Sequence, residues 1–156
     1  MTIEFELQQP ELLAQSVELD AIPSVLDLLA EHLNLTKPYE FSIRLVDDTE
    51  SAELNSQYRN KQGPTNVLSF PYEEMPGVET DLLGDLVICA PLVIAQAEEQ
   101  AKSVQMHFTH LVIHGTLHLL GYDHESQQEA QDMEQIEIKL MLKAGFKDPY
   151  VAIDPN

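Results

Sequence analysis

Three histidines in one short stretch have the residue type and the spacing of a metal site. The stretch reads His-Gly-Thr-Leu-His-Leu-Leu-Gly-Tyr-Asp-His and runs from His114 to His124. On a helix, His114 and His118 would stack on one face, one turn apart. Gly121 can end that helix in a left-handed conformation, so that the chain turns and brings His124 back to the same point. Three converging neutral imidazoles favour a first-row metal, with zinc expected, and leave a fourth position for water.

The alternative is a pair of buried core histidines that bind no metal. The neighbouring residues are apolar and predict a buried helix: Leu111, Val112, Ile113, Leu117, Leu119 and Leu120. Two buried imidazoles without a metal would each need a hydrogen-bond partner of their own. His110 shares the face of His114 and is interpreted as a core or supporting residue, because a fourth ligand would close the site. The glycine and the third histidine favour the metal site.

A metal held by three histidines lowers the pKa of its water to about 7 and polarises a bound oxygen, which suits hydrolysis. The spacing His-x3-His-x2-Gly-x2-His is that of the long metzincin zinc motif. In metzincins a glutamate general base follows the first histidine, whereas this chain has Gly115 there. Peptidase chemistry is therefore disfavoured. The nearest carboxylates in sequence, Asp123 and Glu125, either orient an imidazole or are solvated turn residues.

Such a site also needs a cation for the negative charge that develops on a substrate. Arg59 is the leading candidate, because a guanidinium is always charged and matches phosphate with two parallel hydrogen bonds. Arg59 begins a loop at 59–66 that contains glycine and proline, and Lys61 lies two residues further on. The alternative is a surface salt bridge, which the spacing alone favours.

The pattern of apolar residues predicts an α+β fold. Strands are expected at 3–7, 41–45, 67–70 and 84–89, and helices at 23–33, 48–58, 91–102, 104–120 and 126–144. Strands joined through helices favour parallel pairing, whereas the loop at 71–80 allows the last two strands to be antiparallel. We therefore expect a mixed four-stranded sheet, mostly parallel with one antiparallel strand, packed with about five to six helices. The metal helix should lie on this sheet in a metzincin-like arrangement.

Two helix starts can be assigned from capping residues. Asp48 and Thr49 are cap candidates for the helix before Arg59, and Ser126 is expected to cap the last helix with Glu129 as its capping-box partner. The inner face of the helix before Arg59 is expected to contain three residues: Ala52, Leu54 and Tyr58.

Length and composition indicate one globular unit. The 156 residues are 44% apolar, which predicts a single globular domain over 1–156. Because it contains the histidine site, we interpret it as a single metal-dependent hydrolase domain. The single Cys89 excludes a disulfide framework and a cysteine-rich zinc site, and fits a reducing compartment. No signal segment or membrane span is visible, so a cytoplasmic location is expected. The net charge of −19 repels bare phosphate backbone, so any anion binding must be local and DNA is not an expected partner.

Two segments make the chain resemble a known family. The histidine stretch 114–124 is similar to the signature of the YbeY family of bacterial endoribonucleases, and so is the segment 58–71, Tyr-Arg-Asn-Lys-Gln-Gly-Pro-Thr-Asn-Val-Leu-Ser-Phe-Pro. The strand at 84–88, Gly-Asp-Leu-Val-Ile, supports both. Asn66 stands where many members are expected to have aspartate, which is a mild departure.

The resemblance implies a zinc-dependent endoribonuclease that is specific for single-stranded RNA. It implies a role in ribosomal RNA maturation, notably at the 3′ end of 16S rRNA, and in ribosome quality control, with ribosomal RNA and ribosomal or ribosome-associated proteins as partners. His114, His118 and His124 match the family's metal ligands, and Arg59 matches its conserved arginine. Two other functions stay open: a metal hydrolase acting on peptides or small molecules, and a ribosome-assembly factor with a structural metal.

Overall fold

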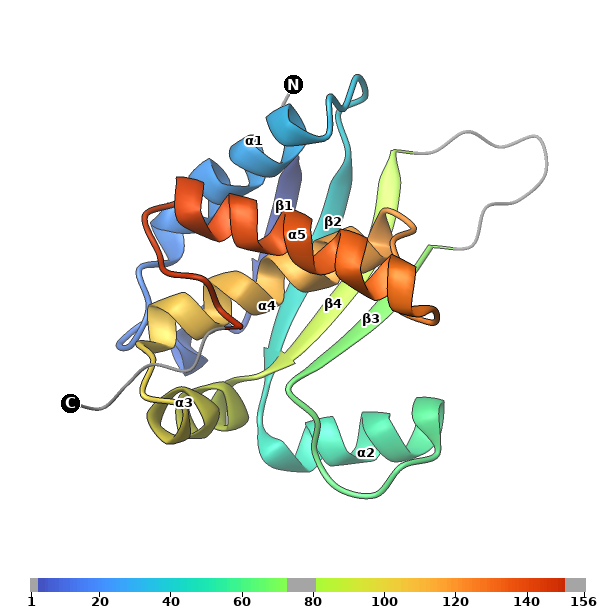
Figure 1. Cartoon of the computed structure of the whole chain (residues 1–156). Coiled ribbons are helices and arrows are strands. Elements are labelled where there is room, and N and C mark those ends of the chain that lie inside the picture. Colours follow the sequence, from blue (N-terminus) through green and yellow to red (C-terminus); the bar gives the residue numbers. More distant parts are fainter. Residues whose placement is uncertain (1–2, 73–80, 151–156) are drawn as a thin grey trace.

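A four-stranded mixed sheet forms the centre of the molecule (Figure 1). The structure, a computed structural model, describes residues 3–72 and 81–150. Strands β1 (Glu4–Gln8), β2 (Glu40–Val46), β4 (Leu82–Cys89) and β3 (Val67–Pro71) lie in the order β1-β2-β4-β3. β1, β2 and β4 are parallel, and β3 is antiparallel to β4. The predicted mixed sheet is confirmed; most of the predicted 71–80 loop, residues 73–80, lies outside the described residues.

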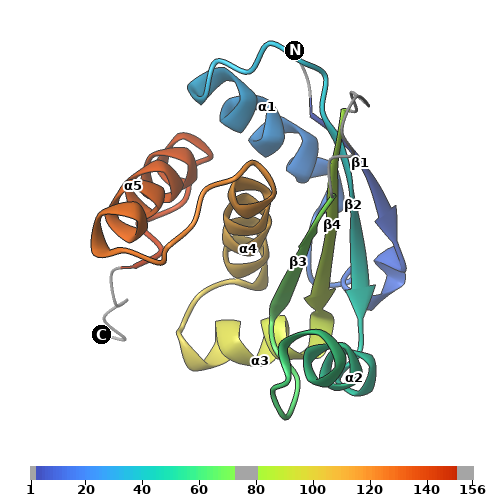
Figure 2. The same cartoon turned by 90° about the vertical axis from the view of Figure 1, so that its right-hand side faces the viewer.

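Five α-helices lie in the described part of the chain: α1 (Ile22–His32), α2 (Asp48–Arg59), α3 (Ala90–Glu99), α4 (Val104–Leu119) and α5 (Gln127–Lys143). Two short 3₁₀ helices, Pro10–Leu12 and Leu19–Ala21, were not predicted. α1 and α4 lie against one face of the sheet, and α5 lies outside α4 as a third layer (Figure 2). Among the described helices, none has the length and apolar character needed to cross a bilayer.

Helix α4 is buried between the sheet and α5, which explains why it is apolar on nearly every side. Its side chains Phe108, Ile113 and Leu117 are completely buried. At Gly115 the helix comes so close to β4 that an added Cβ would lie 2.7 Å from Cδ2 of Leu86. A glutamate at this position, the general base of a metzincin, would therefore collide with the Leu86 side chain, which would have to move.

A smaller core lies on the opposite face of the sheet, next to α2. Val46, Leu68, Val87 and Cys89 form it, with Leu54 of α2 packed against them. Burial raises the pKa of the Cys89 thiol to about 11, so the thiol stays neutral. A buried, neutral thiol is a poor nucleophile, so Cys89 is expected to be chemically inert.

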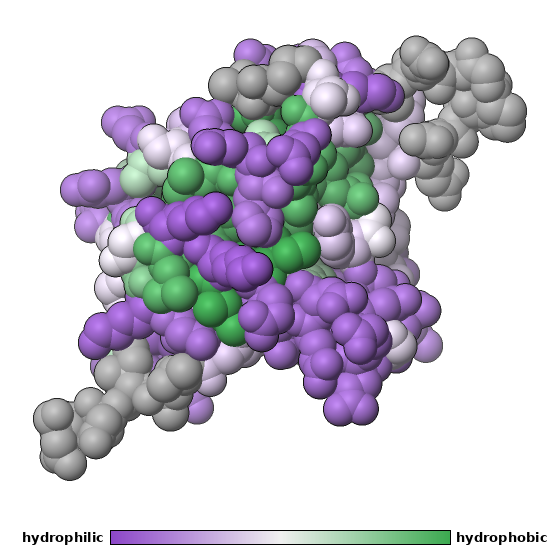
Figure 3. All heavy atoms as spheres, turned by 45° about the horizontal axis from the view of Figure 1, so that its top comes forward, coloured by the Kyte–Doolittle hydropathy of each residue, from purple (hydrophilic) through white to green (hydrophobic). Residues whose placement is uncertain are grey.

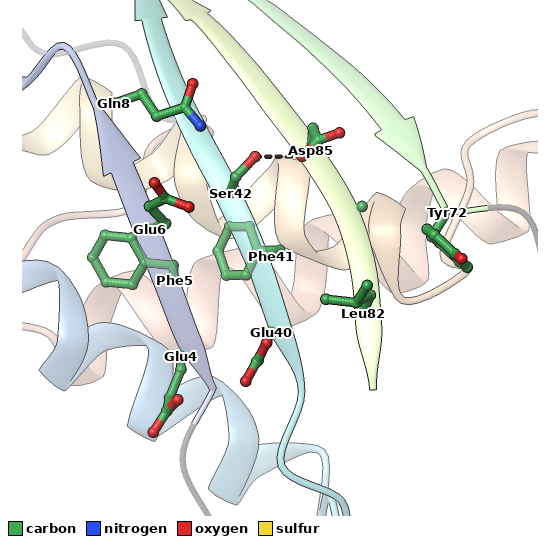
Figure 4. Close-up of a pocket in the computed structure, with 11 residues that line it drawn as sticks. Glu4, Phe5, Glu6, Gln8, Glu40, Phe41, Ser42, Tyr72, Leu82 and Asp85 are labelled. Atoms are coloured by element: carbon green, nitrogen blue, oxygen red, sulfur yellow. Dashed lines mark hydrogen bonds between the residues drawn. The ribbon is translucent and has the colours of Figure 1, made fainter. Parts of the chain in front are cut away.

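The rest of this opposite face is open to solvent and acidic. Figure 4 shows a hollow there, lined by Glu4, Glu6, Glu40 and Asp85, with Asp85 accepting a hydrogen bond from Ser42. In the view of Figure 3, hydrophilic side chains surround patches of apolar ones. The acidic hollow concentrates part of the −19 charge on a face that would repel RNA.

Candidate metal centre

The end of α4 and the turn after it bring the three predicted histidine ligands together. Ring centroids are 4.6 Å apart for His114 and His118, 5.0 Å for His118 and His124, and 6.0 Å for His114 and His124. The turn depends on Gly121, whose φ of +103° confirms the predicted left-handed conformation. The helix pair, the glycine turn and the third histidine thus meet as the spacing predicted.

The partners of His114 and His118 determine where the proton of each ring lies. Nδ1 of His114 is 3.1 Å from a carboxylate oxygen of Glu137, and Nδ1 of His118 is 3.0 Å from the backbone oxygen of Tyr122. Both partners are hydrogen-bond acceptors, so each Nδ1 must donate. In the neutral rings, Nε2 then carries a lone pair on both histidines.

These two lone pairs face each other, because the Nε2 atoms are 3.1 Å apart. Without a proton between them the contact is repulsive, and a cation that accepts both lone pairs would remove the repulsion. Burial, reinforced by the neighbouring His114 and His124, lowers the pKa of His118 and disfavours protonation as the remedy. The donor set therefore fits a divalent metal such as zinc.

Asp123 lies at the same point and has an acceptor role in the turn. Ligand atoms of His118, Asp123 and His124 all lie within 4.8 Å of one another. The Asp123 carboxylate accepts a hydrogen bond of 2.7 Å from the backbone N–H of His124. It is thus close enough either to orient His124 or to join the ligands, whereas Glu125 has no contact of this kind in the described structure.

Sequence analysis missed a buried carboxylate behind the histidines. One oxygen of Glu137, on α5, is 2.6 Å from Nε2 of His110, 3.1 Å from Nδ1 of His114 and 2.9 Å from the hydroxyl of Tyr150. The side chain is only 1% exposed. Its position four residues after Met133 places it on the apolar face of α5, and an acid on such a face is the signal that could have revealed it.

Glu137 is held in its ionised form. Burial alone would raise its pKa, but the hydrogen bonds from His110 and His114 lower the pKa to about 2. Its second oxygen, Oε2, is buried and has no hydrogen-bond partner among the residues that the structure describes. A buried carboxylate behind an imidazole is a common support of metal sites, because it fixes the ring and makes it a stronger ligand. His110 thus has the supporting position that its spacing predicted.

Arg59 lies in the same cleft as the three histidines. The cleft holds about 700 Å³ and is lined by Tyr58 and Arg59 at the end of α2 and by residues 65–71, which include β3. Its other wall consists of His114, His118 and residues 121–124. Arg59 is exposed and forms no ion pair with any residue that the structure describes. The surface salt bridge considered as its alternative role is therefore not formed in the described structure.

The loop after Arg59 is tied to α2 by two buried polar residues. Ser51 exchanges hydrogen bonds with the backbone of Thr65, and the amide of Asn55 donates to the backbone oxygen of Gly63. These residues are the buried residues of α2. The predicted inner face was wrong for Tyr58, which is exposed, and Ala52 is only half-buried, whereas Leu54 does pack against the small core beside α2. The predicted cap was also displaced by one residue, since the side chain of Asp47 caps the helix.

Comparison with known proteins agrees with this geometry. The family model described as "Endoribonuclease YbeY" matches residues 3–145, nearly the whole chain. The chain belongs to the YbeY family. A solution structure of the Thermotoga maritima protein TM1509 is 25% identical in sequence and has a TM-score of 0.55, with 97% of this chain and 99% of that chain covered. The resemblance inferred from the two sequence segments is thus confirmed, and the fold is shared with a solved structure.

In this YbeY-family site, Glu137→Gln should weaken metal binding while leaving the chain folded. Glutamine has nearly the same shape but no negative charge, so the His114 ring loses a charged acceptor. Loss of such a supporting contact typically costs about 10- to 100-fold in metal affinity. Zinc affinity measured by competition with a chromophoric chelator tests this. Glu134→Gln, on an exposed position of the same helix, is the matched control; equal affinities for all three proteins would contradict a role for Glu137.

Gly121→Val should also weaken zinc binding, because a β-branched residue resists positive φ. Strain of this kind costs about 1–3 kcal/mol, and its relief would displace His124. Gly145→Val is a close control: Gly145 has φ +93°, and at both glycines an added Cβ has no atom within 4 Å. Both variants should lose thermal stability, but only Gly121→Val should lose zinc affinity. Unchanged affinity in Gly121→Val would show that the turn does not position His124.

Proposed function

We propose that this chain is a metal-dependent endoribonuclease that cleaves single-stranded RNA. Membership of the YbeY family supports an endoribonuclease role in ribosomal RNA processing. The proposal of metal-dependent cleavage of single-stranded RNA rests on one observation: a single cleft is lined by Arg59 together with His114, His118 and His124. Zinc is the proposed metal, one per chain, with the three histidines as ligands and Arg59 as the catalytic cation.

Each group has a defined task in phosphodiester hydrolysis. A bound divalent metal would supply Lewis acidity at the point where the imidazoles meet. Glu137 and the backbone oxygen of Tyr122 orient the rings of His114 and His118. Arg59 can bind the non-bridging phosphate oxygens with two N–H groups and stabilise the charge that builds there. The ties from Ser51 and Asn55 keep the Arg59 loop in place without burying the guanidinium.

The same geometry argues against the two other functions. A peptidase of the metzincin type needs a carboxylate after the first histidine, and Leu86 fills the space beside Gly115. A purely structural metal would be closed by four protein ligands and would not need a large cleft with an unpaired arginine. Asp123 could supply a fourth ligand, so metal-dependent cleavage remains the deciding experiment.

A ribosomal RNA precursor that contains the 3′ end of 16S rRNA is the substrate to test. Metal-loaded wild type should cleave it, whereas metal-stripped protein and His118→Ala should not. His32→Ala, in α1 and far along the chain from the cleft, is the control and should cleave normally. Binding of the RNA without cleavage by any form would favour an assembly factor. Cleavage that survives complete metal removal would contradict the proposed mechanism.

The cellular setting forms part of the proposal. We place the protein in the cytoplasm as a single hydrolase domain over 1–156, acting in 16S rRNA 3′-end maturation and ribosome quality control together with ribosomal or ribosome-associated proteins. Its acidic surface supports this setting, because a charge of −19 disfavours free RNA and favours RNA presented by a partner. Rapid unspecific degradation of free RNA at physiological salt would contradict this part.

A further inference from the structure

A second groove continues from the cleft past His114. It holds about 330 Å³ and shares Asn66, Val67 and His114 with the cleft. Its remaining walls come from α4, from the residues between α3 and α4, and from the last described residues, Pro149 and Tyr150. Sites for small ligands begin at about 300 Å³, so the groove has the volume for one nucleotide unit.

Tyr150 gives this groove a fixed aromatic ring. Its hydroxyl donates to Glu137 at 2.9 Å, and its ring lies edge-on to His110, with centroids 5.2 Å apart and an interplanar angle of 85°. Nevertheless, 46% of the residue is exposed. An exposed ring that is held by its hydroxyl group and by contact with His110 is a suitable platform on which a nucleobase can stack.

Amide groups beside the ring can read or hold the edge of a base. Asn66 donates 3.1 Å to the side-chain oxygen of Gln96, which is also 2.9 Å from Nε2 of His107. The hydrogen bond to Gln96 orients the side-chain amide of Asn66. The amide oxygen of Asn66 has no hydrogen-bond partner among the described residues. Gln100 adds a second amide to the groove wall. Amides present both donors and acceptors, as the edges of bases do.

A cation lies in the same groove. Nζ of Lys102 donates 2.5 Å to the backbone oxygen of Pro149, which positions the ammonium group on the groove wall. The chain has only 8 basic residues against 27 acids, yet Arg59 lines the cleft and Lys102 lines the groove that adjoins it. Two cations along one continuous depression complement a chain of phosphates.

We propose that this groove binds one unstacked nucleotide of the RNA next to the scissile phosphate, with its base on Tyr150 and a backbone phosphate at Lys102. The proposal rests on the proposed endoribonuclease function and gives it a source of single-strand preference. A base inside a duplex would have to leave its stack to reach Tyr150, which costs a few kcal/mol. An unpaired base has no such cost.

The test compares two short probes on zinc-loaded protein: an RNA octamer of uridines, and an octamer with the same ribose-phosphate backbone but no bases. Tyr150→Ala should weaken binding of the uridine octamer roughly 5- to 150-fold, the range of one lost base–aromatic stack, and leave the abasic octamer nearly unchanged. Lys102→Met should weaken both probes and lower the salt dependence of log K by roughly 0.7, the value for one phosphate contact on a single strand. Anisotropy of a labelled probe, with its integrity checked by gel, measures both effects.

Controls separate stacking from indirect effects. Tyr72→Ala removes a tyrosine of similar exposure, 44%, from the acidic hollow on the far face of the sheet (Figure 4). This variant should bind both probes as tightly as the wild type does. Tyr150→Phe keeps the ring but loses the contact with Glu137, and should retain most of the base-dependent binding. Lys37→Met, at an exposed lysine outside both depressions, is the control for Lys102→Met.

Three outcomes have distinct meanings. Equal losses on both probes in Tyr150→Ala, or no loss on either, would overturn the stacking site. An unchanged salt dependence in Lys102→Met would overturn the phosphate contact. Base-dependent binding by a wild-type protein that never cleaves RNA would support the groove and reject the proposed activity, so the two failures are distinguishable.

Discussion

Replacement of both His114 and His118 by alanine should reduce bound zinc from about one ion per chain to almost none. The pair supplies two of the three imidazoles, and its Nε2 atoms are 3.1 Å apart with both lone pairs facing inward. The remaining His124 and Asp123 are both about half exposed, with side chains 59% and 48% accessible. Two exposed ligands on a turn cannot hold the ion against water and chelators. Metal content measured by elemental analysis after gel filtration tests this.

Thermal stability gives a second readout for the same variant. Zinc that binds the folded chain only should raise the melting temperature of the wild type, in proportion to the logarithm of its concentration. The double variant should show no such rise, whereas His32→Ala should behave like the wild type. Full metal content in the double variant would reject the assignment of both ligands, whatever its activity.

Arg59→Ala should reduce the rate of RNA cleavage by about 10²–10³, while metal content and fold remain intact. Loss of one preorganised donor to a developing oxyanion costs roughly 3–4 kcal/mol. The guanidinium is exposed and lies in the cleft, and among described residues it has no ion pair to lose. Its removal should therefore act on the transition state more than on stability. Single-turnover cleavage at matched metal occupancy measures the effect.

Arg59→Lys should lie between wild type and Arg59→Ala, because an ammonium group supplies charge but not the planar pair of donors. Arg44→Ala is the matched control: Arg44 is the other arginine of the chain and forms an ion pair of 2.7 Å with Glu50 at a distance from the cleft lining. It should cleave RNA at the wild-type rate. A cleavage rate of Arg59→Ala within about threefold of the wild-type rate would show that Arg59 is only a surface charge. This threshold lies well below the loss of rate expected for one donor.

The fold was predictable where local patterns and short connections agree. Alternation along Phe41, Ile43 and Leu45 identified β2. The loop-like composition of residues 71–80 allowed β3 and β4 to be antiparallel, which the register of Val67 with Ile88 confirms. The cap of α5 was also predicted, since Ser126 accepts from the N–H of Glu129. These features depend on residues close in sequence, which is why one sequence suffices to identify them.

Features that depend on tertiary contacts were not predictable in the same way. Ser51 and Asn55 resemble surface residues of a helix, and only the loop that folds over them makes them an inner face. Glu137 lies 23 residues after His114, and its role depends on how α5 packs against α4. The histidines were found because one helix turn and one glycine bring them together. Their supporting carboxylate was missed because no local spacing connects it to them.

The contacts with Glu137 and Tyr150 also determine when the site can form during synthesis of the chain. Both residues follow the three histidines in the sequence and are therefore translated after them. A nascent chain that has emerged only as far as His124 carries all three imidazoles, but it lacks the carboxylate that orients His114 and the contact of Lys102 with Pro149. The proposed metal centre can therefore gain these supporting contacts only after α5 and the segment up to Tyr150 have left the ribosome, the particle whose RNA the protein is proposed to cut.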